Sequence, residues 1–123
     1  MFELKIEDHF AAAHNLRGYQ GACEALHGHN WKVEVVARAE TLNDIGLAID
    51  FKDLKLALGG VLDGLDHRYL NDLPQFSQKN PSSENIAKYI FEELAERLGP
   101  SGVRVHKVTA WESEKACASY LEE

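Results

Sequence analysis

The segment CEALHGHNWKVEVVARA, residues 23–39, indicates both a type of fold and a candidate site. From Asn30 onward apolar and polar residues alternate, which is typical of a half-buried β-strand. Side chains two apart in an extended chain point to the same face, so His27 and His29 can approach one metal ion. Gly28 between them leaves room for a ligand or a second backbone. The apolar residues of this strand are Trp31, Val33, Val35 and Ala37.

A third histidine strengthens the metal hypothesis, because an isolated His-x-His pair in a strand is more often a plain surface pair. His14 ends an earlier extended segment and follows small alanines at 11–13. Without a bulge, His14 is in phase with Ile6, and His27 and His29 are in phase with the apolar residues of their own strand. All three imidazoles are then expected on the apolar, helix-covered face. Three histidines leave one coordination position open, as in catalytic zinc sites, although imidazole also suits copper, nickel and iron.

The rest of the chain predicts a single α+β domain, residues 1–123, with the order strand, strand, helix, helix, strand, strand. We expect a curled four-stranded antiparallel sheet with both helices on one face. Its other face and both edges stay open, and open edges favour a homo-oligomer. The first helix is expected to be capped by Asp50 and to stop or be interrupted at Gly59-Gly60, and the second to follow Pro81 and a serine cap. The expected elements are strands at 1–10, 30–39, 103–112 and 116–121, and helices at 51–58 and 83–98.

Composition limits the classes of partner. The net charge is −7, with 20 acidic and 13 basic residues, which argues against nucleic acid. An anionic small substrate would need local cationic groups or a metal. No run is apolar and long enough for a membrane span, and the N-terminus lacks a secretory signal. Cys23 and Cys117 do not form a disulfide framework, so a cytoplasmic protein is expected, with Cys117 in the core.

Three further positions have both a structural and a chemical interpretation. The Asp66-His67 pair is more often a solvated turn, but a carboxylate can orient an imidazole for proton transfer. Cys23 is either a small buried residue or a thiolate stabilised by a nearby cation. Glu112 is either a solvent-facing strand end or a carboxylate that accepts paired N–H bonds from a guanidine-like ring edge. In a regular strand Glu112 points to the side opposite Val105 and Trp111. Its side chain can reach the histidine pocket only if the strand contains a bulge or the pocket is shared between subunits.

Together these motifs resemble the family of 6-pyruvoyl-tetrahydropterin and 6-carboxytetrahydropterin synthases over nearly the whole chain. The resemblance implies a tunnelling fold (T-fold), in which trimers form a barrel, two trimers stack into a homohexamer and active sites lie at subunit interfaces. The segments that carry it are FAAAH at 10–14, CEALHGH at 23–29, IDF at 49–51, LDH at 65–67, NPSSE at 80–84 and Glu112.

The resemblance also implies a role for each matching residue. His14, His27 and His29 bind zinc, and Cys23 accepts a proton. His67, oriented by Asp66, relays protons. Glu112 binds the pterin ring and can take part in the proton relay. Ser82 and Ser83 match a family stretch near the pterin in which threonine is common.

The implied substrate is 7,8-dihydroneopterin triphosphate, whose side-chain hydroxyls zinc would hold and acidify. Cys23 and His27 are separated by three residues, as in the branch that makes 6-carboxytetrahydropterin for queuosine, whereas typical biopterin enzymes have five. A 6-carboxytetrahydropterin synthase is therefore expected, with release of acetaldehyde and triphosphate. The alternatives are a 6-pyruvoyl-tetrahydropterin synthase and a non-catalytic zinc-binding oligomeric domain. No residue is assigned to the triphosphate.

Overall fold

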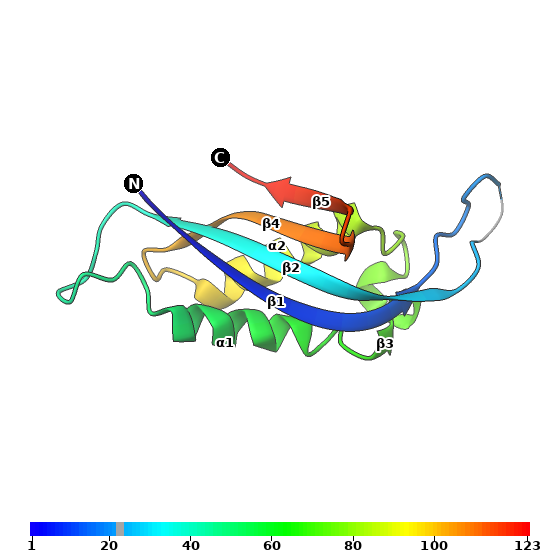
Figure 1. Cartoon of the computed structure of the whole chain (residues 1–123), viewed down its shortest axis with the longest axis horizontal. Helices are drawn as coiled ribbons and strands as arrows, with labels where there is room; N and C mark the ends of the chain where they lie inside the picture. Colours follow the sequence, from blue (N-terminus) through cyan, green and yellow to red (C-terminus); the bar gives the residue numbers. More distant parts are fainter. Residues whose placement is uncertain (22–23) are drawn as a thin grey trace.

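A twisted sheet with both α-helices on one face forms the domain, in a computed structural model that describes residues 1–21 and 24–123 (Figure 1). The strand order is β3-β1-β2-β4-β5. The strands are β1 (Phe2–His14), β2 (His27–Ala39), β3 (Arg68–Tyr69), β4 (Arg104–Ser113) and β5 (Ala116–Leu121). The helices are α1 (Phe51–Leu62), α2 (Ser83–Leu98) and two short 3₁₀ turns, η1 (Leu70–Asp72) and η2 (Pro74–Phe76).

The predicted four-stranded antiparallel sheet is wrong in one respect, because β3 adds a fifth strand. β3 runs parallel to β1 and pairs Ala12 with Arg68 and Ala13 with Tyr69. Two residues are too few to produce a periodic pattern, so the sequence gives no signal for this strand. The sheet is therefore mixed, and β3 covers part of an edge that was expected to be open.

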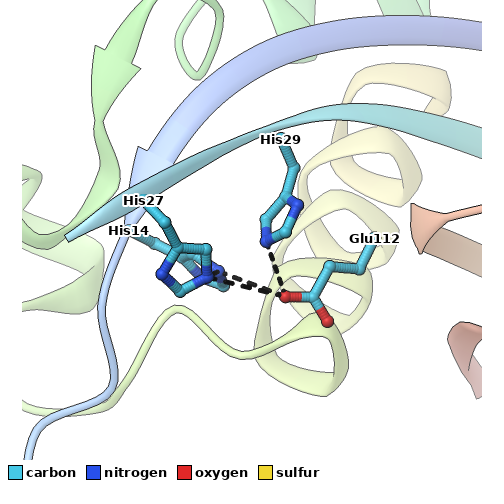
Figure 2. Close-up of side chains that lie close together, drawn as sticks. All are labelled: His14, His27, His29 and Glu112. Atoms are coloured by element: carbon cyan, nitrogen blue, oxygen red, sulfur yellow. Dashed lines mark hydrogen bonds and ion pairs between the residues drawn. The ribbon is translucent and has the colours of Figure 1, made fainter. Parts of the chain in front are cut away.

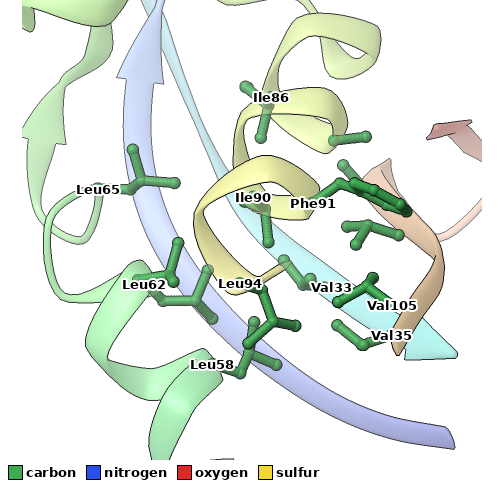
Figure 3. Packing of buried hydrophobic residues seen from close by; sticks show 14 of the residues in the cluster. Val33, Val35, Leu58, Leu62, Leu65, Ile86, Ile90, Phe91, Leu94 and Val105 are labelled. Carbon is green, nitrogen blue, oxygen red and sulfur yellow. The ribbon is translucent and has the colours of Figure 1, made fainter. Parts of the chain in front are cut away.

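The predicted phases of the first two strands are confirmed. Ile6, Phe10 and Ala12 of β1 are buried, as are Trp31 and alternate residues along β2. These residues contact the helices, where α2 supplies Ile86, Ile90 and Leu94 to the core (Figure 3). The histidines in phase with these residues therefore lie at one end of the helix-covered face.

Strand β4 changes phase along its length because it contains a bulge. Val36 pairs with Lys107 but the adjacent Ala37 pairs with Val105, so His106 is the extra residue on β4. Beyond it, Val108 and Ala110 face the core. The expectation that Trp111 shares a face with Val105 is wrong for this reason, and Trp111 instead donates Nε1–H to Glu34 on the open face at 3.0 Å.

The first helix is longer than predicted. Asp50 caps α1 by accepting a hydrogen bond from the Lys52 amide at 2.9 Å, as expected. The helix then continues through Gly59-Gly60, because Val61 and Leu62 extend the buried stripe of the helix. Burial of these side chains outweighs a glycine cost of about 1 kcal/mol per residue.

The second helix agrees with the prediction, from the serine cap to Leu98. Cys117 on β5 is exposed, so its expected place in the core is wrong. No helix in the described part of the chain combines the length and apolar character needed to cross a bilayer.

Candidate metal centre

Four side chains from three strands meet at one end of the helix-covered face (Figure 2). His14 ends β1, His27 and His29 begin β2, and Glu112 lies near the end of β4. Each offers one ligand atom, and these atoms all lie within 4.8 Å of one another. His14 is buried and the other three are half-buried, so the group is partly shielded from water. The predicted convergence of the three histidines is therefore confirmed as geometry.

Two of the imidazoles have their outer nitrogen held by a backbone carbonyl. His14 Nδ1 donates to the Pro81 carbonyl at 2.7 Å, and His27 Nδ1 donates to the Ala25 carbonyl at 2.9 Å. Because the proton of each neutral ring is on Nδ1, each Nε2 presents a lone pair. These two Nε2 atoms are 3.1 Å apart. Facing lone pairs repel at this distance, and a shared cation would remove the repulsion.

The third imidazole also presents a nitrogen to the same space. His29 Nε2 is buried and makes no well-aligned hydrogen bond among the described residues, but the Glu112 carboxylate lies 2.8 Å from it. Three imidazole nitrogens and a carboxylate form a donor set that suits zinc and other divalent transition metals. The residues present therefore fit a metal ion.

The surroundings of His29 favour the neutral form that ligation requires. Burial lowers the pKa of His29 below its usual value of 6.5, and the neighbouring His14 and His27 act in the same direction. The Glu112 carboxylate opposes this effect on the His29 pKa but does not reverse it. A metal ligand must be deprotonated, so this balance favours binding near neutral pH.

Glu112 reaches the group because of the bulge at His106. After the phase change it follows Val108 and Ala110 on the core face, and its Oε1 lies 2.8 Å from His29 Nε2. Of the two routes expected from the sequence, a bulge or a shared pocket, the bulge is present within one chain. A second irregularity follows, because Trp111 pairs with Cys117 whereas Ser113 pairs with Ala116.

The sequence did not reveal the groups that hold the histidines. Asn85 Nδ2 donates to the Asn80 carbonyl at 2.8 Å, and Asn80 exchanges side-chain bonds with both backbone groups of Arg17, at 2.8 and 2.9 Å. These bonds fix the segment that contains Pro81. A backbone carbonyl has no side-chain signature, so this support could not be predicted.

A second network of hydrogen bonds holds Asn15, at the start of the segment between His14 and His27. Asn71 accepts from the Asn15 amide at 3.0 Å and donates to the Asn15 carbonyl at 2.8 Å. Tyr69 donates to Asn15 Oδ1 at 2.6 Å, and Asn15 Nδ2 donates to the Glu24 carbonyl at 3.1 Å. β3 and η1 are therefore tied to Asn15, which follows His14, and through it to Glu24, which precedes His27.

The predicted Asp66–His67 pair is present but does not belong to the four-residue group. Asp66 Oδ2 lies 2.9 Å from His67 Nδ1, and Asp66 Oδ1 accepts from the Ala11 amide at 2.9 Å. The Ala11 bond is the main cause that lowers the pKa of Asp66, with His67 contributing. His67 has a positive φ of 58° and an exposed side chain. It borders an open hollow of about 530 Å³ beside β1 and β3 that His29, Ala13 and Tyr69 also line.

The remaining predicted site residues have separate positions. Ser82 is the N-cap of α2 and accepts from the Asn85 amide at 3.2 Å, and Ser83 is the first residue of this helix. Both directly follow Pro81, whose carbonyl holds His14. Cys23 lies outside the described residues.

Fold and site together define a small α+β protein in which three histidines and one carboxylate form a group that could hold a metal ion. A sequence model of 6-pyruvoyl tetrahydropterin synthase matches residues 3–123, so the chain belongs to that family. The fold agrees with this result. A solved structure of 6-pyruvoyl tetrahydropterin synthase from Caenorhabditis elegans superposes with a TM-score of 0.84 at 30% identity, covering 99% of this chain and 96% of that one.

Curated relatives have more than one name. A 6-carboxy-5,6,7,8-tetrahydropterin synthase from Synechocystis is 35% identical over 98% of this chain and 94% of the relative. A dihydroneopterin monophosphate aldolase from Pyrococcus furiosus is 37% identical over 86% of this chain and 85% of the relative. Family membership is therefore shown, and the relatives differ in named reaction.

Proposed function

We propose that the chain is a zinc-dependent 6-carboxy-5,6,7,8-tetrahydropterin synthase of the cytoplasmic queuosine pathway. Its substrate is 7,8-dihydroneopterin triphosphate, and its products are 6-carboxytetrahydropterin, acetaldehyde and triphosphate. The observation that carries this proposal is the convergence of one ring nitrogen each from His14, His27 and His29. Several relatives with this name match most of the chain, including those from Synechocystis and Haemophilus influenzae.

The residues have the following proposed roles. His14, His27 and His29 hold zinc, which when bound supplies Lewis acidity toward the substrate hydroxyls. Cys23 removes a carbon-bound proton. His67, kept in orientation by Asp66, exchanges protons with the substrate side chain.

Substrate binding involves two further groups. Glu112 accepts paired N–H bonds from the pterin ring edge. Ser82 and Ser83 lie beside the ring, although the Ser82 oxygen also caps α2.

The proposed assembly is a homo-oligomer, a trimer or hexamer, with active sites between subunits. It is supported by the position of His67, whose exposed side chain lies outside the metal group of its own chain. The free edge of β5 is suited to pairing with a strand of a neighbouring chain.

Product analysis tests the reaction. Zinc-loaded protein incubated with 7,8-dihydroneopterin triphosphate is expected to give a carboxypterin and acetaldehyde, identified by mass. A pyruvoylpterin product would instead assign the biopterin branch. Cys23→Ala is expected to abolish turnover while zinc binding and folding remain. Full activity in that variant would exclude Cys23 as the base, and no turnover by the unaltered protein would favour a non-catalytic zinc domain.

A second candidate is aldol cleavage of dihydroneopterin monophosphate, which the name of the Pyrococcus furiosus relative suggests. Parallel incubations with the monophosphate and the triphosphate separate the two reactions. We expect turnover of the triphosphate only. Cleavage of the monophosphate at a higher kcat/KM would overturn the carboxypterin assignment.

A further inference from the structure

The two oxygens of Glu112 have different surroundings. Oε1 faces all three imidazoles, at 2.8 Å from His29 Nε2, 3.4 Å from His14 Nε2 and 3.9 Å from His27 Nε2 (Figure 2). The other oxygen points away from the rings (Figure 2). One carboxylate oxygen is therefore a member of the converging group.

Four of the six ligand-atom separations in this group are near those of a four-coordinate cage, and all six are within 4.8 Å. Bonds of 2.0–2.1 Å in tetrahedral geometry place neighbouring ligand atoms roughly 3.3 Å apart. Glu112 Oε1 lies 2.8–3.9 Å from the three nitrogens, and His14 Nε2 lies 3.1 Å from His27 Nε2. The carboxylate oxygen thus lies near the fourth corner, the position that three histidines alone would leave open.

Glu112 Oε1 lies 2.8 Å from His29 Nε2, a distance that suits an ion pair. Through this contact the carboxylate acts to raise the pKa of His29, against the effect of burial. Two ligands of a common ion also approach this closely, because both are directed at the ion. The contact therefore fits shared ligation.

We infer that Glu112 is the fourth metal ligand in the substrate-free protein and must leave the metal to receive the pterin ring. Only the second part of this inference, the departure of Glu112 from the metal, rests on the proposed function. A paired contact needs both carboxylate oxygens turned towards one ring edge, whereas Oε1 faces the imidazoles and the other oxygen points away from them. Ring binding opens the coordination position that the substrate hydroxyls need, so metal and ring compete for one side chain.

Cobalt substitution tests the ligand without any substrate, because Co²⁺ absorption in the visible range reports coordination. Glu112→Gln is expected to change this spectrum and to weaken Co²⁺ binding at least about 10-fold, measured by chelator competition. Glu114→Gln, which removes an equal charge from the exposed β4–β5 turn, is expected to change neither property. An unaltered spectrum in Glu112→Gln overturns the inference. Glu112→Asp, which keeps the charge but withdraws the oxygen, provides the same test if the glutamine variant does not fold.

Competition by the ring is tested with pterin itself, which has no phosphorylated side chain. Pterin is expected to shift the Co²⁺ spectrum of the unaltered protein towards that of Glu112→Gln, and to weaken Co²⁺ binding by the same factor by which Co²⁺ weakens pterin binding. Pterin that binds equally well with and without Co²⁺, or that does not bind, overturns the exchange. Neither arm measures turnover, so an inactive protein would refute the proposed function and leave this result intact.

Discussion

At the residue scale, the metal centre depends on which ring nitrogen carries the proton. The Pro81 carbonyl holds the proton of His14 on Nδ1, and the Ala25 carbonyl does the same for His27. Both Nε2 atoms are thereby oriented towards the position that a metal ion could occupy. An arrangement prepared in this way avoids the loss of side-chain entropy that ordering the rings on binding would cost.

Removal of one ring tests this arrangement. His27→Ala is expected to lower zinc affinity by more than about 100-fold, because the loss of a ligand exceeds the roughly 10–100-fold cost of losing an outer partner. Chelator competition measures the affinity. His9→Ala removes an exposed histidine from β1 and serves as the control, with unchanged zinc binding expected. Equal affinity in the two variants would remove His27 from the ligand set.

The lowered pKa of His29 predicts acid sensitivity of the metal-free protein. Because the pKa is lower in the folded state, the unfolded chain binds the proton more readily as the pH falls through about 6.5. Stability attributable to His29 is therefore present at higher pH and is lost on acidification. We expect Tm, measured in a chelator, to fall less between about pH 7.5 and about pH 5.5 in His29→Gln than in the unaltered protein. A steeper fall in the variant would reverse the assigned sign.

At the element scale, the two glycines of α1 differ in their surroundings. A Cβ at Gly59 would have no heavy atom within 4 Å, whereas one at Gly60 would lie 2.5 Å from Arg97 Nη1. Arg97 Nη2 also donates to the Gly60 carbonyl at 3.3 Å. Gly60 therefore allows a close approach between α1 and α2, and Gly59 has no such role.

Alanine substitutions test this difference. Gly59→Ala is expected to raise the free energy of unfolding by about 1 kcal/mol, since alanine is the better helix former. Gly60→Ala is expected to gain less, because Arg97 must move and lose its bond to the carbonyl. Urea denaturation of both variants measures the change, and a larger gain at Gly60 would contradict the argument.

The sequence predicted the elements with regular periodicity and missed those without it. Alternation identified β1 and β2 with the correct faces, and the serine cap identified the start of α2. The sequence does not indicate β3, which has two residues, and it places the end of α1 too early, because burial of Val61 and Leu62 outweighs the glycine penalty. The phase of Trp111 was wrong because a bulge depends on pairing between strands, and its position has no local signature.

At the scale of the whole molecule, one chain contains two chemically distinct groups. The group of three histidines and Glu112 lies on the helix-covered face. His67 lies beside β1, where it is exposed and paired with Asp66. The three histidines were predictable because each is in phase with buried residues. The position of His67 relative to them was not, because it depends on how the loop after α1 returns to the edge of β1.

Mixing two inactive variants tests whether neighbouring chains complete each site. Cys23→Ala and His67→Ala are each expected to lack turnover. Co-refolded in equal amounts, they are expected to recover about one quarter of the normal activity, because random assembly pairs intact groups in that fraction of sites. No recovery from a correctly assembled mixture would place both groups in the same chain's site.

The bulge at His106 restricts how β4 can change in length during evolution or engineering. Side chains alternate with a period of two, so deleting any single residue between the bulge and Glu112 would transfer the carboxylate to the opposite side of the sheet. An insertion of one residue would have the same effect, whereas a paired insertion would restore the side but lengthen the strand. In this short stretch, whether the number of residues is odd or even matters more for the position of Glu112 than the identity of most residues.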